Sequence, residues 1–158
     1  MEVSFREEIK RLELGAGETF YGEGILAVTK ALLQSGVSYV GGYQGAPVSH
    51  LLDVLLQSED LLARLGVHLQ TCTNEAAAAA LLAASINYPV RGAVTWKSIV
   101  GTNVAADALS NLASPGVQGG ALIIVRNPVP SIGGSVVSRL RPPKATPPAP
   151  HITLPIVS

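Results

Sequence analysis

The stretch Leu69-Gln70-Thr71-Cys72-Thr73-Asn74-Glu75, followed directly by five alanines at 76–80 and by Leu81-Leu82, decides the predicted fold. It predicts a strand, a sharp turn, and a helix that begins with a carboxylate and is otherwise almost entirely apolar. A glutamate at a helix start is ordinary, because its charge complements the N-terminal end of the helix dipole. A helix this apolar must be buried, however, and it would carry the Glu75 carboxyl toward a poorly solvated place. A carboxyl held there can share a proton with a ligand nitrogen.

Outward from this stretch, predicted strands and helices alternate at short spacing. The predicted strands are short apolar runs, at residues 37–40, 67–71, 92–96 and 121–125. The predicted helices have apolar side chains at helical spacing, at residues 24–35, from 47 onward, and at 60–64, 75–87 and 99–112. Apolar strands that alternate with helices are typical of a parallel sheet covered on both faces. The predicted fold class is therefore α/β.

Composition limits the classes of function. The chain has 158 residues, enough for one domain with a real core, and is 47% hydrophobic and only 14% charged. Such a composition predicts that a partner covers part of the surface. A formal net charge of zero without a basic stripe argues against a nucleic-acid partner. The single cysteine, Cys72, excludes an internal disulfide and a cysteine-rich metal or iron–sulfur site within the chain. The charged N-terminus, and apolar runs shorter than the ~18 residues of a membrane span, predict a cytoplasmic protein that does not enter a membrane.

The composition changes abruptly near Val125, which predicts a domain over 1–125 and a tail over 126–158. The tail has no Asp or Glu and holds eight of the eleven prolines. We expect it to be disordered, because prolines this dense exclude a central strand. A truncated or out-of-frame chain end would have this composition, and so would a true linker.

Two glycine-containing segments compete as ligand loops. The segment Gly22–Ala27, GEGILA, matches the G-x-G-x-x-A dinucleotide fingerprint and opens a predicted helix. It lacks the preceding buried strand and the later acidic residue that the fingerprint requires, which disfavours nucleotide binding. The loop Gly41–Pro47 is better placed, because it follows a strand's carboxyl end, where open parallel sheets bind ligands. A plain strand-to-helix turn is the alternative for this loop.

Local helix energetics offer a competing account of the acidic turn. Asn74 makes a good N-cap and Glu75 a good first-turn residue, each contributing about 1 kcal/mol or less. Lys97 and Asn103 follow the third predicted strand, at the same sheet edge as Glu75. Both residues could contact a ligand; alternatively, Lys97 is a solvated charge and Asn103 a helix-surface amide. Cys72 fits a small buried residue better than a reactive thiolate.

Four segments together resemble a known family, over Gly36 to Val125. They are GGYQGAP at 41–47, TNEAAAAALLAAS at 73–85, TWKSIVGTNVAADAL at 95–109 and ASPGVQGGALIIV at 113–125. Their order and spacing resemble the pyrimidine-binding domain of thiamine diphosphate-dependent 2-oxoacid:ferredoxin oxidoreductases, most closely the alpha subunit of indolepyruvate ferredoxin oxidoreductase. The resemblance implies that Glu75 is catalytic and that its carboxyl meets the ring nitrogen of the cofactor's aminopyrimidine. It also implies a set of residues that wall the cofactor pocket: Gly45, Ala46, Pro47, Asn74, Lys97 and Asn103.

Departures from the family pattern limit what this chain could do alone. The family loop is usually Tyr-Pro-Gly-Thr-Pro, whereas Gln44 and Ala46 replace its first proline and its threonine. Neither the G-D-G…N diphosphate and magnesium motif nor cluster-binding cysteines occur in the chain. The resemblance therefore implies a cofactor shared with a diphosphate-binding domain elsewhere, with magnesium and iron–sulfur clusters only in the rest of the enzyme. Ferredoxin would be an indirect partner, the assembly an oligomer, and aryl pyruvates such as indolepyruvate the substrates. We expect the isolated chain to be inactive, and the alternative is a non-catalytic α/β assembly subunit.

Overall fold

One five-stranded sheet forms the centre of the structure, a computed structural model that describes residues 5–46, 48–126 and, as backbone, 135–140. Its strands lie in the order β2-β1-β3-β4-β5. Their bounds are β1 Tyr39–Gly42, β2 His68–Thr71, β3 Gly92–Lys97, β4 Ala121–Arg126 and β5 Ser135–Leu140. The pairs among β1 to β4 are parallel, with Tyr39 opposite both His68 and Gly92, whereas β5 runs antiparallel to β4.

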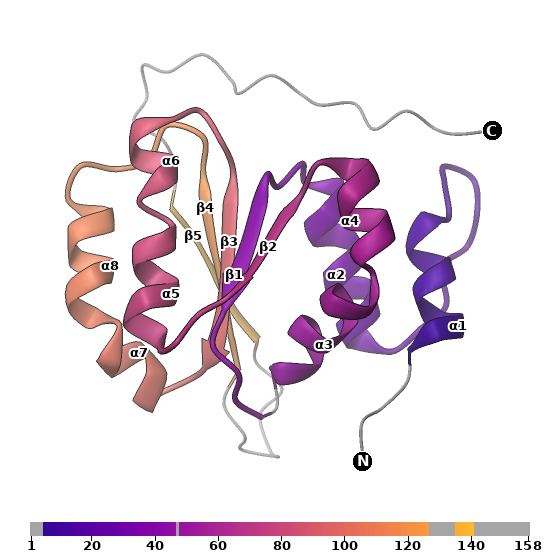
Figure 1. Ribbon diagram of the computed structural model, residues 1–158, viewed down its shortest axis with the longest axis horizontal. Helices are drawn as coiled ribbons and strands as arrows, with labels where there is room; N and C mark the ends of the chain where they lie inside the picture. The colour runs from indigo at the N-terminus through magenta and orange to yellow at the C-terminus, as the bar shows by residue number, and fades with distance from the viewer. Residues whose placement is uncertain (1–4, 47, 127–134, 141–158) are drawn as a thin grey trace.

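Helices cover both faces of this sheet, which confirms the predicted α/β class (Figure 1). One face carries α1 Arg6–Ile9, the 3₁₀ turn η1 Lys10–Glu13, α2 Gly24–Gln34, α3 Ser49–Gln57 and α4 Glu59–Leu65. The other face carries α5 Glu75–Leu81, α6 Ala84–Asn87, α7 Val100–Val104 and α8 Ala106–Ala113. No helix among the described residues is long and apolar enough to cross a bilayer.

The first strand lies two residues later than the sequence predicts. Gly41 and Gly42, predicted as loop, are strand residues because the absence of a side chain lets neighbours approach closely. A Cβ on Gly42 would lie 2.7 Å from the Thr95 carbonyl oxygen, and one on Gly41 would overlap Leu81. A glycine in a strand commonly marks such an approach.

Two predicted helices are each divided in the structure. The helix predicted at 75–87 becomes α5 and α6, with i→i−3 hydrogen bonds such as Ala83 N to Ala80 O at 3.0 Å between them. The buried Tyr39 hydroxyl lies 3.4 Å from the Leu82 carbonyl oxygen and 2.6 Å from Ser85 Oγ. A side chain from β1 therefore forms hydrogen bonds at the point where the helix is divided. The helix predicted at 99–112 becomes α7 and α8, and α7 begins only at Val100.

The second strand and the tail also differ from expectation. β2 is not a buried apolar strand, because it lies at the sheet edge, where His68, Gln70 and Thr71 are exposed. The segment predicted as tail contributes β5 at the opposite edge, and this strand contains no proline. The rest of that segment, 127–134 and 141–158, lies outside the described residues, as does Pro47.

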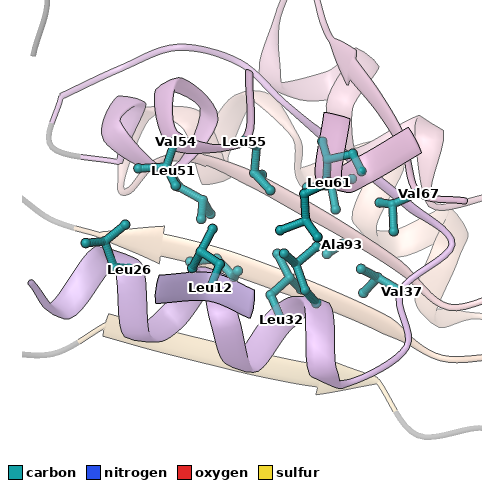
Figure 2. Close-up of a cluster of buried hydrophobic side chains, with 14 of the residues drawn as sticks. Leu12, Leu26, Leu32, Val37, Leu51, Val54, Leu55, Leu61, Val67 and Ala93 are labelled. Carbon is teal, nitrogen blue, oxygen red and sulfur yellow. The ribbon is translucent and has the colours of Figure 1, made fainter. Parts of the chain in front are cut away.

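Two cores of different composition fill the layers. The leucine-rich core lies between the sheet and α2, α3 and α4, and Figure 2 shows side chains of α2 and α3 within it. Its labelled members in the figure are Leu12, Leu26, Leu32, Val37, Leu51, Val54, Leu55, Leu61, Val67 and Ala93. The alanine-rich core lies under α5 to α8 and includes Ala78, Ala79, Leu82, Val94, Trp96, Ala105 and Leu112.

Candidate functional site

The carboxyl ends of the parallel strands meet along one edge of the sheet, the lower edge in Figure 1. Three connections leave from this edge. Residues 43–48 lead from β1 to α3, residues 72–74 lead from β2 to α5, and residues 98–99 lead from β3 to α7. Since open parallel sheets bind ligands at this end, it is the candidate site.

Asn74 and Glu75 begin α5 in the way that helix energetics predict. Asn74 is the N-cap, and its side-chain Oδ1 accepts a hydrogen bond from the Ala77 N–H at 2.8 Å. Its backbone carbonyl accepts from the Ala78 N–H at 3.1 Å. The Asn74 amide is therefore committed to the cap, a structural role that explains this residue without a ligand.

The Glu75 side chain extends from the first turn of α5 toward α7. A Cβ placed on Gly101 would lie 2.9 Å from Glu75 Cγ and 3.0 Å from its Oε1, so the carboxylate lies against the Gly101 backbone. Glu75 is half-buried, and among the described residues its carboxylate has no hydrogen-bond or ion-pair partner. The group is therefore held in place by packing while its oxygens keep their capacity to accept a hydrogen bond.

Gly101 is the residue that sequence reasoning missed. A side chain there would also meet Trp96 Cδ1 at 2.7 Å, so only glycine lets α7 cross over both the tryptophan and Glu75. The Trp96 indole N–H donates to Thr102 Oγ1 at 3.3 Å, which fixes the first turn of α7 on the end of β3. A lone glycine inside a predicted helix was the available signal, because such a glycine usually has a packing reason.

Lys97 and Gly45 meet at the end of β3. A Cβ on Gly45 would lie 2.9 Å from Lys97 Cβ, so the 43–48 loop packs on the stem of the lysine, whose side chain is exposed. The Tyr43 N–H donates to the Thr95 carbonyl at 3.0 Å and ties the same loop to β3. The structure thus brings Glu75 to Gly101 and Gly45 to Lys97. Ala46 and Asn103 are exposed along this edge.

A strained residue precedes α7. Ile99 has φ 63° and ψ −79°, and it alone among the described non-glycine residues has a positive φ. A β-branched residue in this region is an outlier, and such strain commonly lies at functional sites. Ile99, Val100 and Val104 are also 56%, 66% and 49% exposed. We call these three residues the apolar rim.

The remaining candidates have structural roles. Burial raises the pKa of the Cys72 thiol, against a smaller opposing effect of a backbone hydrogen bond with Gly42, so the thiolate is disfavoured. The segment that precedes the Gly22–Ala27 motif, residues 14–21, contains no strand, so the nucleotide fingerprint lacks its required setting. Within the described part of the chain, no group of three or more His, Cys, Asp or Glu side chains is arranged to hold a metal ion.

Comparison with known proteins finds relatives that all carry the same name. The chain is 31% identical over 113 residues to the indolepyruvate oxidoreductase subunit IorA of Methanothermobacter marburgensis, a match that covers 72% of this chain and 18% of the relative. It is 31% identical over 109 residues to the subunit of the same name from Thermococcus kodakarensis, covering 69% of this chain and 16% of the relative. The chain thus spans less than a fifth of the length of these curated relatives.

No family model matches the chain, and no solved structure matches it either. The resemblance expected from the four sequence segments is nevertheless confirmed by the relatives, which agree with one another in name. This chain is a distant homologue of the indolepyruvate oxidoreductase subunit IorA over about 110 of its residues.

Proposed function

We propose that this chain supplies the pyrimidine half of a thiamine diphosphate site in a 2-oxoacid:ferredoxin oxidoreductase, with Glu75 as the residue that contacts the cofactor. The observation that carries the proposal is the half-buried Glu75 carboxylate, held against Gly101 at the carboxyl-end edge of the sheet in a homologue of IorA. Local capping accounts for the position of Asn74 but leaves the Glu75 carboxylate without a partner among the described residues.

Two features of Glu75 support a contact with an aminopyrimidine. Its side chain is held against Gly101, and its carboxylate has no partner among the described residues. A carboxyl in this position would form a hydrogen bond with a ring nitrogen of the pyrimidine, and its partial burial would limit competition from water. Thiamine diphosphate, when bound, would supply a thiazolium ring as the electron sink for decarboxylation of a 2-oxoacid. The role of this chain is to orient the pyrimidine and to hold the proton at its ring nitrogen.

The proposed wall of the half-site comes from the two connections that follow β1 and β3, at the same edge of the sheet as Glu75. We assign pocket contacts to Gly45, Ala46, Pro47, Lys97 and Asn103 as the resemblance implies, with Asn74 positioning the turn. Lys97 offers a cation at the end of β3, and its contact with Gly45 couples the two loops. Aryl pyruvates such as indolepyruvate are the proposed substrate class, because the relatives are named for that substrate.

A partner must complete the site. The apolar rim exposes three aliphatic side chains near the start of α7. Exposed apolar side chains that lie together are typical of a surface that another domain covers. The proposed partner is the diphosphate-binding domain or subunit of the same enzyme, with magnesium, iron–sulfur clusters and ferredoxin reached only through the rest of that assembly. Purified alone, the chain should show no 2-oxoacid-dependent dye reduction.

One observation favours a second candidate, a non-catalytic assembly subunit. The Asn74 cap and a first-turn glutamate together make a well-formed helix start, whatever binds beside it. Under this alternative the apolar rim would bind a partner, and Glu75 would have no ligand.

Titration of the chain with thiamine separates the two candidates without the missing partner. Trp96 is the only tryptophan, so its indole N–H signal in a ¹⁵N spectrum is unambiguous, and it lies beside Gly101. We expect millimolar thiamine to shift the Trp96 indole and Gly101 amide signals, and Glu75→Gln to abolish both shifts.

The matched control is Glu23→Gln, the same substitution at the exposed N-cap of α2. It should leave the thiamine-induced shifts intact. Shifts that survive Glu75→Gln, or signals that do not move at millimolar thiamine, would favour the assembly candidate over the cofactor site.

A further inference from the structure

The β2 edge of the sheet presents unpaired backbone groups. β2 has a single neighbour, β1, within the described sheet. The N–H groups of His68 and Cys72 donate to the β1 side, to Ser38 O at 3.0 Å and Gly42 O at 2.8 Å. Because the direction of backbone groups alternates along a strand, the N–H and C=O groups of Leu69 and Thr71 point away from the sheet. These groups form a template for another strand.

The sequence of this edge lacks the features that usually prevent strand pairing. Residues 67–73, VHLQTCT, contain no Lys, Arg, Asp, Glu or Pro. Natural edge strands are commonly protected by charge, proline or a bulge. At the other edge of the described sheet lies β5, which pairs antiparallel with β4 and contains Arg139. Of these two edge strands, β2 is the one without a charged residue.

An apolar groove runs beside this edge on the leucine-rich face. It has a volume of about 350 Å³ and is lined by Leu56, Glu59, Leu62, Ala63, Val67, His68 and Leu69. Leu56 is 46% exposed there, and Leu69 packs against the leucine-rich core from the same side. A strand added to β2 would place alternate side chains over this groove.

We propose that the occupant is a second copy of this chain, whose β2 pairs antiparallel with this β2 about a two-fold axis at Leu69. The uncharged strand is compatible with itself, because no like charges meet along β2 in such a pair. Leu69 would contact Leu69 of the second copy beside the groove. The Leu69 N–H of each copy would donate to the Leu69 carbonyl of the other copy. The Thr71 N–H of each copy would donate to the Val67 carbonyl of the other. The Val67 N–H is already bonded to Leu62 O at 2.9 Å and takes no part.

Sedimentation of the full chain over a range of concentrations tests this pairing. The wild-type chain should dimerise, and Leu69→Lys should weaken dimerisation by about 100-fold or more, because two ammonium groups would face each other at the axis. Leu69→Glu should weaken it similarly. A mixture of the two variants should recover a heterodimer, which only a contact between the two copies of residue 69 would allow.

Ala80→Lys is the control, since it adds the same charge on the exposed surface of α5. It should leave dimerisation unchanged. Should the Leu69 variants fail to fold, amide exchange in the wild type still decides, because the Leu69 and Thr71 amides should become protected as concentration rises. A wild-type chain that stays monomeric at several hundred micromolar, or variants that fold and dimerise normally, would overturn the proposal. Pairing through β2 does not depend on the thiamine diphosphate site.

Discussion

The two faces of the sheet are built from different side chains for different purposes. The leucine-rich core packs large aliphatic side chains from α2, α3 and α4, and several of them, including Leu26, Leu51 and Leu55, are completely buried. The alanine-rich core pairs small residues of α5 with the indole of Trp96. Large side chains contribute most of the burial energy, whereas small ones allow close approach of backbone. The leucine-rich face therefore contributes most of the stability, whereas the alanine-rich face positions Glu75.

The approach of α7 to α5 shows what small residues allow. Gly101 lies so close to Trp96 and Glu75 that no Cβ fits without movement. On the leucine-rich face, by contrast, a Cβ added to Gly24 at the start of α2 would have nothing within 4 Å. Matched substitutions on the two faces can therefore test this difference between them.

The largest expected effect is on the leucine-rich face. Leu51→Ala should lower the free energy of unfolding by about 2–5 kcal/mol, because it removes a fully buried side chain and leaves a cavity. Urea denaturation measures this loss. Leu56→Ala, at an exposed position, should change stability by less than about 1 kcal/mol. Equal losses for both variants would contradict the assignment of stability to this core.

Gly101→Ala tests the alanine-rich face. The added Cβ would overlap Trp96 and Glu75 and should lower the free energy of unfolding by about 1–3 kcal/mol. It should also move the Trp96 indole signal. Gly24→Ala, where the space is open, should be neutral or slightly stabilising. An unchanged indole signal in Gly101→Ala would show that Gly101 does not lie against Trp96.

Asn74→Ala separates capping from cofactor contact. Loss of the 2.8 Å bond to the Ala77 N–H should lower the free energy of unfolding by about 1 kcal/mol. Asn74→Ser should restore most of this loss, since serine also caps. If capping is the only role of Asn74, the thiamine-induced shifts should weaken in Asn74→Ala and return in Asn74→Ser, as the stability does. Shifts lost in the stable Asn74→Ser variant would assign Asn74 a direct contact.

Ile99→Gly should relieve the strain before α7. The gain should reach up to about 1 kcal/mol, because relief of a positive φ is partly offset by the greater freedom of glycine in the unfolded chain. Val100→Gly, within α7, should instead destabilise by about 1 kcal/mol. Thermal unfolding of both variants measures the difference, and a loss in Ile99→Gly would mean that Ile99 packs better than its exposure indicates.

The smallest effect concerns the Cys72 thiol, at the margin of the alanine-rich core. Burial raises the pKa of this thiol, so the folded chain keeps the proton to higher pH than the unfolded chain. The contribution of Cys72 to stability is then full below the unfolded pKa and is lost as pH rises through the folded pKa. Iodoacetamide alkylation should reach half-maximal rate at higher pH in the folded chain than in urea. The opposite order would indicate an activated thiolate beside the site.

Local patterns were sufficient for part of this structure. The alternation of apolar strands and helices predicted the α/β class, and the Asn74-Glu75-alanine sequence predicted the start of α5 at Glu75. The strand ends were less predictable. Gly41 and Gly42 have loop chemistry, and only contact with Thr95 and Leu81 makes them strand residues. The exposure of β2 also required the strand order, because a sequence does not state which strand lies at the edge.

Residue identity and near-neighbour spacing were enough to predict the layered class, the single cysteine, the acidic start of the alanine helix and the likeness to IorA. The contact between Gly101 and Glu75, the positive φ of Ile99 and the edge position of β2 became visible only in the folded structure. The first joins residues far apart in the chain, and the last depends on the order of the strands. Such contacts are set by the packing of whole elements against one another, which no local pattern encodes.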